Sequence, residues 1–194
     1  MDNYHHGDLK KALVEEGLIL LNQYGLEGFS LRKVAAKCQV SHTAPYKHFK
    51  NKEELIAAIS HHVKTSFAHA LDQARSRHEN IENKMVAVGV NYVMFMVNNP
   101  DYYRFLFSNK YDCKVEIKTG MIEYYDDPVF HVFYETAVDF FDFYRLPKET
   151  YIKNIIAMWA MVQGLSSLFS GTMTTEEDLE GLVVEMLTQK LKFI

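Results

Sequence analysis

The sequence predicts an all-α protein in which a small N-terminal head is joined by a long helix to a larger helical bundle. Apolar residues make up 48% of the 194 residues, which is enough to bury a core. Only four prolines and nine glycines occur, so long helices can run without interruption. Apolar residues recur at helical spacing, and no segment shows convincing strand-like alternation. We place the two domains at residues 1–52 and 53–194.

Three helices are predicted in the head. Asp8 is expected to cap the first helix, and Gly25 and Gly28 are expected to end it. Ser30 and Ser41 are good N-caps for the second and third helices, because a serine hydroxyl can accept a hydrogen bond from a free amide of the first turn. The third helix is expected to last about two turns and to end near Phe49.

The second predicted helix has one buried stripe and one basic face. Leu31, Val34, Ala35 and Cys38 follow the i, i+3, i+4, i+7 spacing of an amphipathic helix. The third helix carries Pro45 in its first turn, where the missing amide hydrogen has little effect. The third helix is also rich in polar side chains. A buried stripe that holds a short polar helix at a fixed angle is typical of a helix-turn-helix that reads DNA; an ordinary helical hairpin is the alternative.

The body is predicted to begin with a long helix opened by a capping box at Asn51 and Glu54. Loops are expected at residues 75–83 and 109–119. A second capping box, Thr174 with Glu177, is expected to open the last helix, which ends near Leu191. The other predicted helices cover residues 81–98, 101–107, 121–126, 128–144 and 148–171.

Charge is distributed unevenly along the chain, although the net charge is only −4. Residues 1–52 carry eight Lys and Arg against five acids, a balance of +3, and residues 53–194 carry 13 against 20, a balance of −7. A basic head on an acidic body suits a protein that offers one face to phosphates, although chance can also give so small an excess.

The head closely resembles the DNA-binding head of TetR-family transcriptional regulators. The similarity covers roughly residues 8–56 and is carried by FSLRxVA at residues 29–35 and by VSHxAPYxHFxNKEEL at residues 40–55. The YHHGDL start at residues 4–9 and the Ala44-Pro45 pair resemble the subgroup with a WHG C-terminal domain. Trp159 and Gly164 match that name, whereas Gln163 stands where a histidine is expected.

The resemblance implies an all-helical homodimer, usually a repressor, that binds a palindromic operator in double-stranded DNA. Thr43 is expected to contact bases, and Tyr46 and Lys52 to contact phosphates. The positions that commonly face DNA in the family correspond to Ser30, Arg32, Ser41, His42, Thr43, Tyr46, Lys47, His48 and Lys52.

The last two helices resemble the four-helix dimer interface of the family. A role in the core of the monomer is the alternative for these residues, above all for Trp159. The expected interface residues are Trp159, Leu165, Leu168, Phe169, Leu182, Val183, Met186 and Leu187.

A belt of aromatic residues predicts a ligand pocket in the body. Residues 92–144 hold 16 of the 26 aromatic residues, and a plain aromatic core is the alternative. The resemblance favours a cavity for a small apolar or aromatic effector, whose identity the sequence does not give. The expected pocket residues are Tyr92, Phe95, Met96, Tyr103, Phe107, Tyr125, Phe133, Tyr134 and Phe141.

Enzymatic chemistry and cofactors are not expected, because the common catalytic and nucleotide-binding signatures are absent. A small helical enzyme or metal-binding protein is the alternative function, suggested by His62 and His69 on one helical face together with His61, His78 and His131. The polar N-terminus and the two cysteines, Cys38 and Cys113, favour a soluble cytoplasmic protein with reduced thiols. The sequence does not separate a repressor from an activator.

Overall fold

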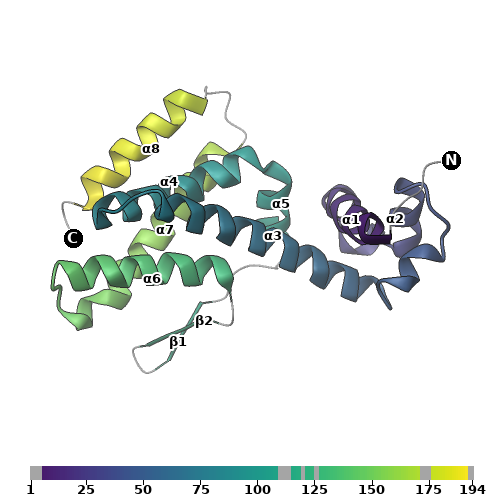
Figure 1. Ribbon diagram of the computed structural model, residues 1–194, viewed down its shortest axis with the longest axis horizontal. Helices are drawn as coiled ribbons and strands as arrows, with labels where there is room; N and C mark the ends of the chain where they lie inside the picture. Colours follow the sequence, from purple (N-terminus) through teal and green to yellow (C-terminus); the bar gives the residue numbers. More distant parts are fainter. Residues whose placement is uncertain (1–5, 109–114, 119–120, 125–126, 171–175, 192–194) are drawn as a thin grey trace. The chain divides into compact units, whose positions relative to one another are not determined.

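The computed structural model describes residues 6–108, 115–118, 121–124, 127–170 and 176–191. These residues form helices and one short antiparallel hairpin (Figure 1), so the predicted all-α class is confirmed for the chain as a whole. The elements are α1 His6–Gly28, α2 Leu31–Lys37, η1 Ala44–Lys47, α3 Lys52–Ser76, α4 Ile81–Asn98, α5 Pro100–Ser108, β1 Val115–Lys118, β2 Met121–Tyr124, α6 Pro128–Phe143, η2 Lys148–Thr150, α7 Tyr151–Phe169 and α8 Glu176–Leu191.

The chain forms two compact units. The first unit is Met1–Val63 with Asp101–Asp112, and the second unit is Lys64–Pro100 with Cys113–Ile194. The division therefore falls inside α3, later than the predicted boundary at residues 52 and 53. The reason is that Leu55, Ile59 and Val63, on the first half of α3, are buried in the core of the first unit. α5 contributes to the same unit, with Phe105 and Leu106 buried.

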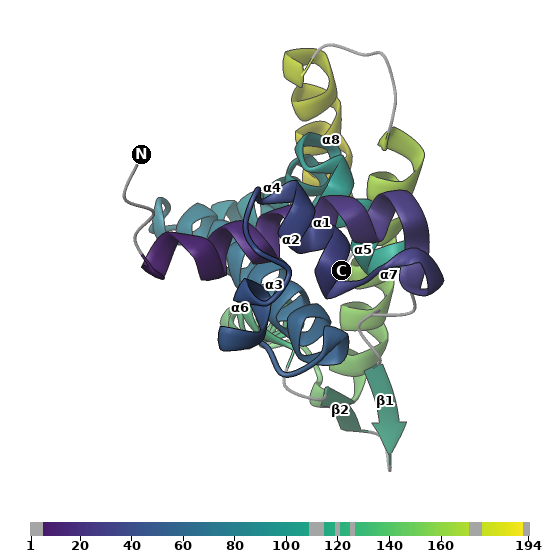
Figure 2. The ribbon, with the colours of Figure 1, turned by 90° about the vertical axis from the view of Figure 1, so that its right-hand side faces the viewer.

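The first unit packs α1 and α2 against the first half of α3 (Figure 2). α1 and α3 approach closely, because a side chain added at Gly17 would meet Ile59 Cδ1 at 3.0 Å. α1 begins at His6, so Asp8 lies inside the helix and is not its cap. The helix is interrupted at Gly25, whose φ of 65° lies in the left-handed region that glycine adopts readily.

Two of the predicted helix caps are confirmed. Ser30 Oγ accepts a hydrogen bond from the Lys33 amide at 3.4 Å and caps α2. Asn51 Oδ1 accepts from the Glu54 amide at 2.9 Å, and Glu54 reaches back to the Lys50 amide at 2.6 Å. This reciprocal pair opens α3, with the returning bond one residue earlier than in the standard capping box.

The second unit packs α6, α7 and α8 around α4, whose buried face includes Val88, Gly89 and Val93. Gly89 lets α8 approach α4 closely, because an added side chain would meet Leu187 Cδ1 at 2.8 Å. Phe67 and Phe95 stack with ring centroids 4.6 Å apart and an interplanar angle of 9°. Aromatic contacts therefore dominate this core, as the sequence belt suggested.

The hairpin of β1 and β2 corrects the helix predicted over residues 121–126. Val115 pairs with Tyr124 and Lys118 with Met121 in an antiparallel register. The sequence carries a weak strand signal here, because Val115 and Ile117 alternate with charged residues before a Thr-Gly pair. Four residues of alternation are too few to outweigh a helical reading. The capping box predicted at Thr174 lies outside the described residues.

Among the described helices, the stretch Lys148–Phe169 is long and apolar enough to cross a membrane by length and composition alone. Part of its apolar surface is explained by packing, since Ile155, Trp159 and Val162 of α7 are buried in the second unit. The stretch also begins at η2, whereas the sequence predicted one uninterrupted helix from residue 148.

Candidate nucleic-acid interface

The first unit presents α2 and η1 as a short helix, a tight turn and a second short helical element. In α2, Leu31, Val34 and Ala35 are buried, whereas Arg32 and Lys37 are exposed. The predicted stripe thus holds α2 in the core by its apolar face. The charged face of α2 is left accessible to a partner.

The turn after α2 is closed by a left-handed residue that sequence reasoning missed. Gln39 has φ 57°; its amide donates to the Ala36 carbonyl at 3.1 Å, and the Val40 amide donates to the Ala35 carbonyl at 3.0 Å. This pair of bonds is a Schellman ending, in which glycine is the usual residue. The turn could not be predicted, because the glycine that normally indicates such an ending is replaced by Gln39.

The element after the turn is a 3₁₀-helix, Ala44–Lys47, and this corrects the predicted two-turn α-helix. Its N-cap is Thr43 instead of Ser41, and the two hydroxyls lie 3.2 Å apart within hydrogen-bonding distance. Pro45 is buried and supplies no amide hydrogen. The Phe49 amide still donates to the Pro45 carbonyl at 2.9 Å, a bond of α-helical spacing.

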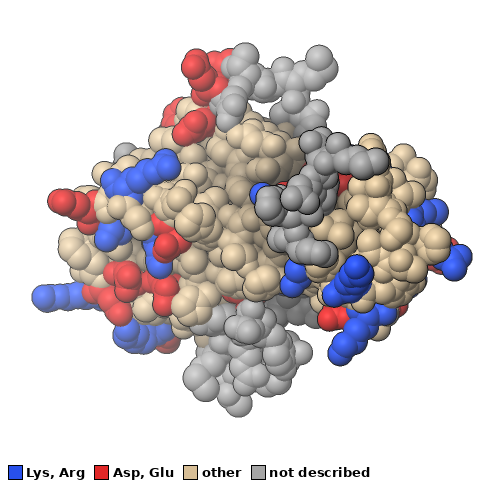
Figure 3. Space-filling model, turned by 45° about the vertical axis from the view of Figure 1, so that its right-hand side comes forward, with Lys and Arg blue, Asp and Glu red and all other residues tan. Residues whose placement is uncertain are grey.

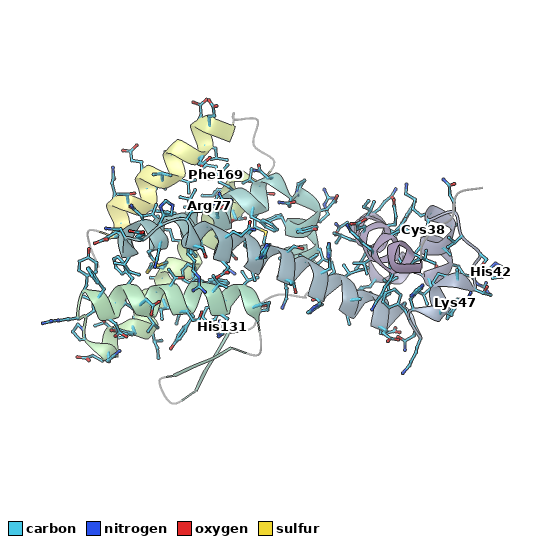
Figure 4. All side chains as sticks on the ribbon, in the orientation of Figure 1. Cys38, His42, Lys47, Arg77, His131 and Phe169 are labelled. Carbon is cyan, nitrogen blue, oxygen red and sulfur yellow. The ribbon has the colours of Figure 1, made fainter. Side chains whose placement is uncertain are left out.

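Most of the predicted DNA-contacting side chains are exposed together on this element and its flanks. Ser41, His42, Thr43, Tyr46 and Lys47 are exposed, and Tyr46 keeps 54% of its accessible surface. Figure 4 labels His42 and Lys47, which lie near each other in the first unit. The buried residues on either side, Pro45 and Phe49, fix the backbone from which these side chains project.

Three of the predicted contacts are held partly inside the unit. Ser30 caps α2, His48 is half-buried, and Lys52 donates to the Leu26 carbonyl at 3.5 Å. His48 Nε2 is buried without a hydrogen-bond partner among the described residues. Ser30 keeps its hydroxyl hydrogen for a further acceptor such as a phosphate oxygen.

The basic side chains of the first unit differ in whether they are free to bind a phosphate. Lys33 donates to the Gly28 carbonyl at 2.7 Å and lies 4.7 Å from the Tyr24 ring centroid. Arg32, Lys37 and Lys47 are exposed and form no ion pair within the described residues. Basic and acidic side chains are interspersed on the face shown in Figure 3. Any phosphate attraction is therefore local to these few side chains.

Cys38 lies at the end of α2 beside this surface. Burial raises the pKa of the Cys38 thiol, and the nearby Glu16 carboxylate raises it further. The thiol is therefore protonated at neutral pH, as expected for a packing residue.

The predicted pocket residues do not form a single cluster. Tyr103 and Phe107 belong to the first unit, where their ring centroids are 4.9 Å apart. Phe133 also lines a small apolar cavity with Met85 and Met158. Tyr125 lies outside the described residues. The other predicted pocket residues belong to the second unit: Tyr92, Phe95, Met96, Phe133, Tyr134 and Phe141.

The predicted interface residues divide between core and surface. Trp159 is 7% exposed, and its ring centroid lies 5.0 Å from those of Tyr92 and Phe133. Trp159 therefore belongs to the core of the monomer, which was the alternative to an interface position. Leu165, Val183 and Leu187 are also buried in the monomer. Leu168 and Leu182 are exposed, and Phe169 and Met186 are partly exposed.

The histidines that suggested a metal site have other neighbours. His62 Nε2 lies 3.1 Å from the Tyr102 hydroxyl, and His69 Nε2 lies 3.0 Å from Gln73 Nε2. In the described ranges of the chain, no three or more His, Cys, Asp or Glu side chains gather in a group that could hold a metal ion.

Comparison with known proteins places the head in a family. The family model for bacterial regulatory proteins of the tetR family matches residues 13–59. The class C tetracycline repressor protein of Escherichia coli is 39% identical over 51 residues, which cover 26% of this chain. The chain thus covers 23% of the length of that repressor.

Solved structures resemble the fold of nearly the whole chain. A TetR-family transcriptional regulator from Haemophilus influenzae RD is 19% identical with a TM-score of 0.66, and the match covers 96% of this chain and 98% of that one. AibR, solved in complex with isovaleryl coenzyme A and operator DNA, is 17% identical with a TM-score of 0.66 and coverages of 92% and 97%. The head match and the shared fold agree: residues 13–59 match the bacterial regulatory proteins of the tetR family, and nearly the whole chain has the fold of the solved structures above.

Proposed function

We propose that this protein is a sequence-specific DNA-binding transcriptional regulator, acting as a ligand-responsive repressor. The observation that carries the proposal is an exposed polar set on a turn and 3₁₀-helix anchored by the buried Pro45 and Phe49; the set is Ser41, His42, Thr43, Tyr46 and Lys47. In this proposal Thr43 contacts base edges, and Tyr46 and Lys52 contact phosphates.

The functional form in this proposal is a homodimer on a palindromic operator, because a two-fold dimer presents two recognition elements to two half-sites. α7 supports this proposal, since it is apolar on its exposed side as well as on its buried side. Ile156 and Leu168 of α7 are exposed, and Leu168 keeps 71% of its accessible surface. Leu182 of α8 adds a third exposed apolar side chain. Exposed apolar rows of this kind are typical of interfaces between subunits.

Ligand response is proposed for the second unit. The aromatic residues around Tyr92 and Phe133 suit a small apolar or aromatic effector, and AibR provides a precedent of the same fold solved with a ligand and its operator. Regulation requires that the effector bind the DNA-free state more tightly than the DNA-bound state. Such a regulator would work as a soluble protein in the cytoplasm.

The proposal is tested by DNA binding of the purified full chain. Fluorescence anisotropy is measured at physiological salt with labelled duplexes from the region upstream of its own gene and with shuffled duplexes of equal composition. We expect a preference of at least about 1,000-fold for one upstream segment, with two chains per duplex by native mass spectrometry. Equal affinity for both sets of duplexes would refute sequence-specific regulation through this region.

A further inference from the structure

A second cavity in the second unit is lined by none of the rings around Trp159, although it shares Val86 and Leu191 with the small cavity beside Phe133. It measures about 530 Å³, within the range of small-molecule sites. Its walls come from the start of α4, from the end of α6 with the loop that follows, and from α8. The lining residues are Glu82, Asn83, Val86, Phe140, Tyr144, Leu146, Val184, Thr188 and Leu191.

One wall of this cavity carries a carboxylate with unused hydrogen-bonding capacity. The Tyr144 hydroxyl donates to Glu82 Oε1. Glu82 Oε2 is buried and has no hydrogen-bond partner among the described residues. The Tyr144 hydrogen bond holds the pKa of the Glu82 carboxyl below its usual range, so the group is ionised at neutral pH. Glu82 Oε2 therefore offers an acceptor to a positive group that enters the cavity.

Apart from Asn83 and Thr188, the remaining lining is apolar or aromatic. The rings of Phe140 and Tyr144, whose centroids are 4.9 Å apart, both line the cavity, and Val86, Val184 and Leu191 complete its apolar surface. Aromatic rings beside a carboxylate favour an organic cation, because ring faces and the carboxylate both attract positive charge. The apolar walls favour an attached hydrocarbon chain or ring.

The cavity lies on a different side of α8 from the proposed dimer surface. Leu179, Val183 and Leu187 form the buried row of α8. With about 100° per residue, Val184 and Thr188 fall on one side of this row, and Leu182 and Met186 fall on the other. A second copy of the chain bound through Leu182 would therefore leave this face of the helix accessible.

We propose that this cavity binds an amphipathic organic cation, with the ammonium group against Glu82 and the apolar part between Phe140, Val184 and Leu191. The cation would donate to or lie against Glu82 Oε2. Binding of a cation at this cavity can be measured without DNA. The result of that measurement does not depend on whether the protein regulates transcription.

The test uses isothermal titration calorimetry of the full chain with decyltrimethylammonium, and with decanoate as an anion of similar chain length. We expect the cation to bind at least about tenfold more tightly than the anion, as expected for one charge-assisted contact. Glu82→Gln should weaken binding of the cation by about tenfold or more and leave decanoate binding unchanged or stronger. The matched control Glu79→Gln removes an exposed acid outside the cavity lining and should leave both affinities unchanged.

A second variant tests the cavity without altering charge. Val184 is partly exposed on α8, so Val184→Trp should fold, fill the cavity and abolish binding of the cation while Glu82 is retained. Thermal unfolding of each variant checks that it is folded. The proposal is overturned if decanoate binds as tightly as the cation, or if either Glu82→Gln or Val184→Trp binds the cation like the unaltered chain.

Discussion

The cores of the two units are built from different kinds of side chain. This difference explains why the sequence predicts the core of the first unit better than that of the second. The first unit buries mainly aliphatic side chains, such as Leu13, Val34 and Ile59, and leaves short polar side chains on one exposed element. The second unit buries a network of aromatic rings around Trp159. A core built from regularly spaced aliphatic residues is visible as a pattern, whereas ring contacts between distant helices are not.

The largest expected effect tests the aromatic core. Trp159→Ala should lower the free energy of unfolding by about 3–5 kcal/mol, because it removes a buried indole and leaves a cavity among Tyr92, Phe130 and Phe133. Leu168→Ala on the same helix is the matched control, and in the monomer it should change stability by less than about 0.5 kcal/mol. Both values come from urea unfolding followed by circular dichroism. Equal effects of the two changes would show that Trp159 does not support the core.

The next effect tests the division of roles on the exposed element of the first unit. Thr43→Ala should alter base preference at one operator position by about 1–3 kcal/mol, because an exposed hydroxyl and methyl group are lost. Lys52→Ala should weaken binding to every sequence and reduce the salt-dependence slope by about 1. Binding to an operator library at several salt concentrations separates the two outcomes. Uniform weakening by both variants would contradict the assignment of Thr43 to base contacts.

The smallest effect tests the turn that the sequence did not reveal. Gln39→Gly should stabilise the protein by up to about 1 kcal/mol, because Gln39 has φ 57° and glycine adopts this region without strain. The same change at Gln23, an exposed position inside α1, should destabilise the protein by about 1 kcal/mol. Thermal unfolding compares the two variants. Destabilisation at both positions would mean that the left-handed turn carries no strain.

Local signals predicted the elements whose stability depends on neighbouring residues. Ser30 and Asn51 cap α2 and α3 as expected, since a cap needs only an oxygen acceptor within three residues of a free amide. The same reasoning was wrong at Ser41, because the 3₁₀-helix begins after Thr43, whose side chain makes no capping hydrogen bond. The cap at Asp8 was also wrong, because α1 begins two residues earlier.

The two candidate sites also differ in how well the sequence predicts them. The exposed positions of η1 and the buried stripe of α2 follow from the helical period and the family motif, and their contacts with DNA stay a prediction. The cavity beside Glu82 could not be predicted, because Glu82, Phe140 and Val184 are separated by many residues and meet only through packing of α4, α6 and α8. The WHG subgroup assignment, which rests on Trp159 and Gly164, also stays a prediction.

The sequence by itself determined the helical class, the order of most helices and the family of the head, because capping, periodicity and motif spacing act over a few residues. Only the tertiary structure decided that the first half of α3 and α5 belong to the first unit and that Trp159 lies in the core. It also decided that a short hairpin replaces a predicted helix. These outcomes depend on which distant side chains bury one another, and burial is a property of the assembled chain that no local pattern specifies.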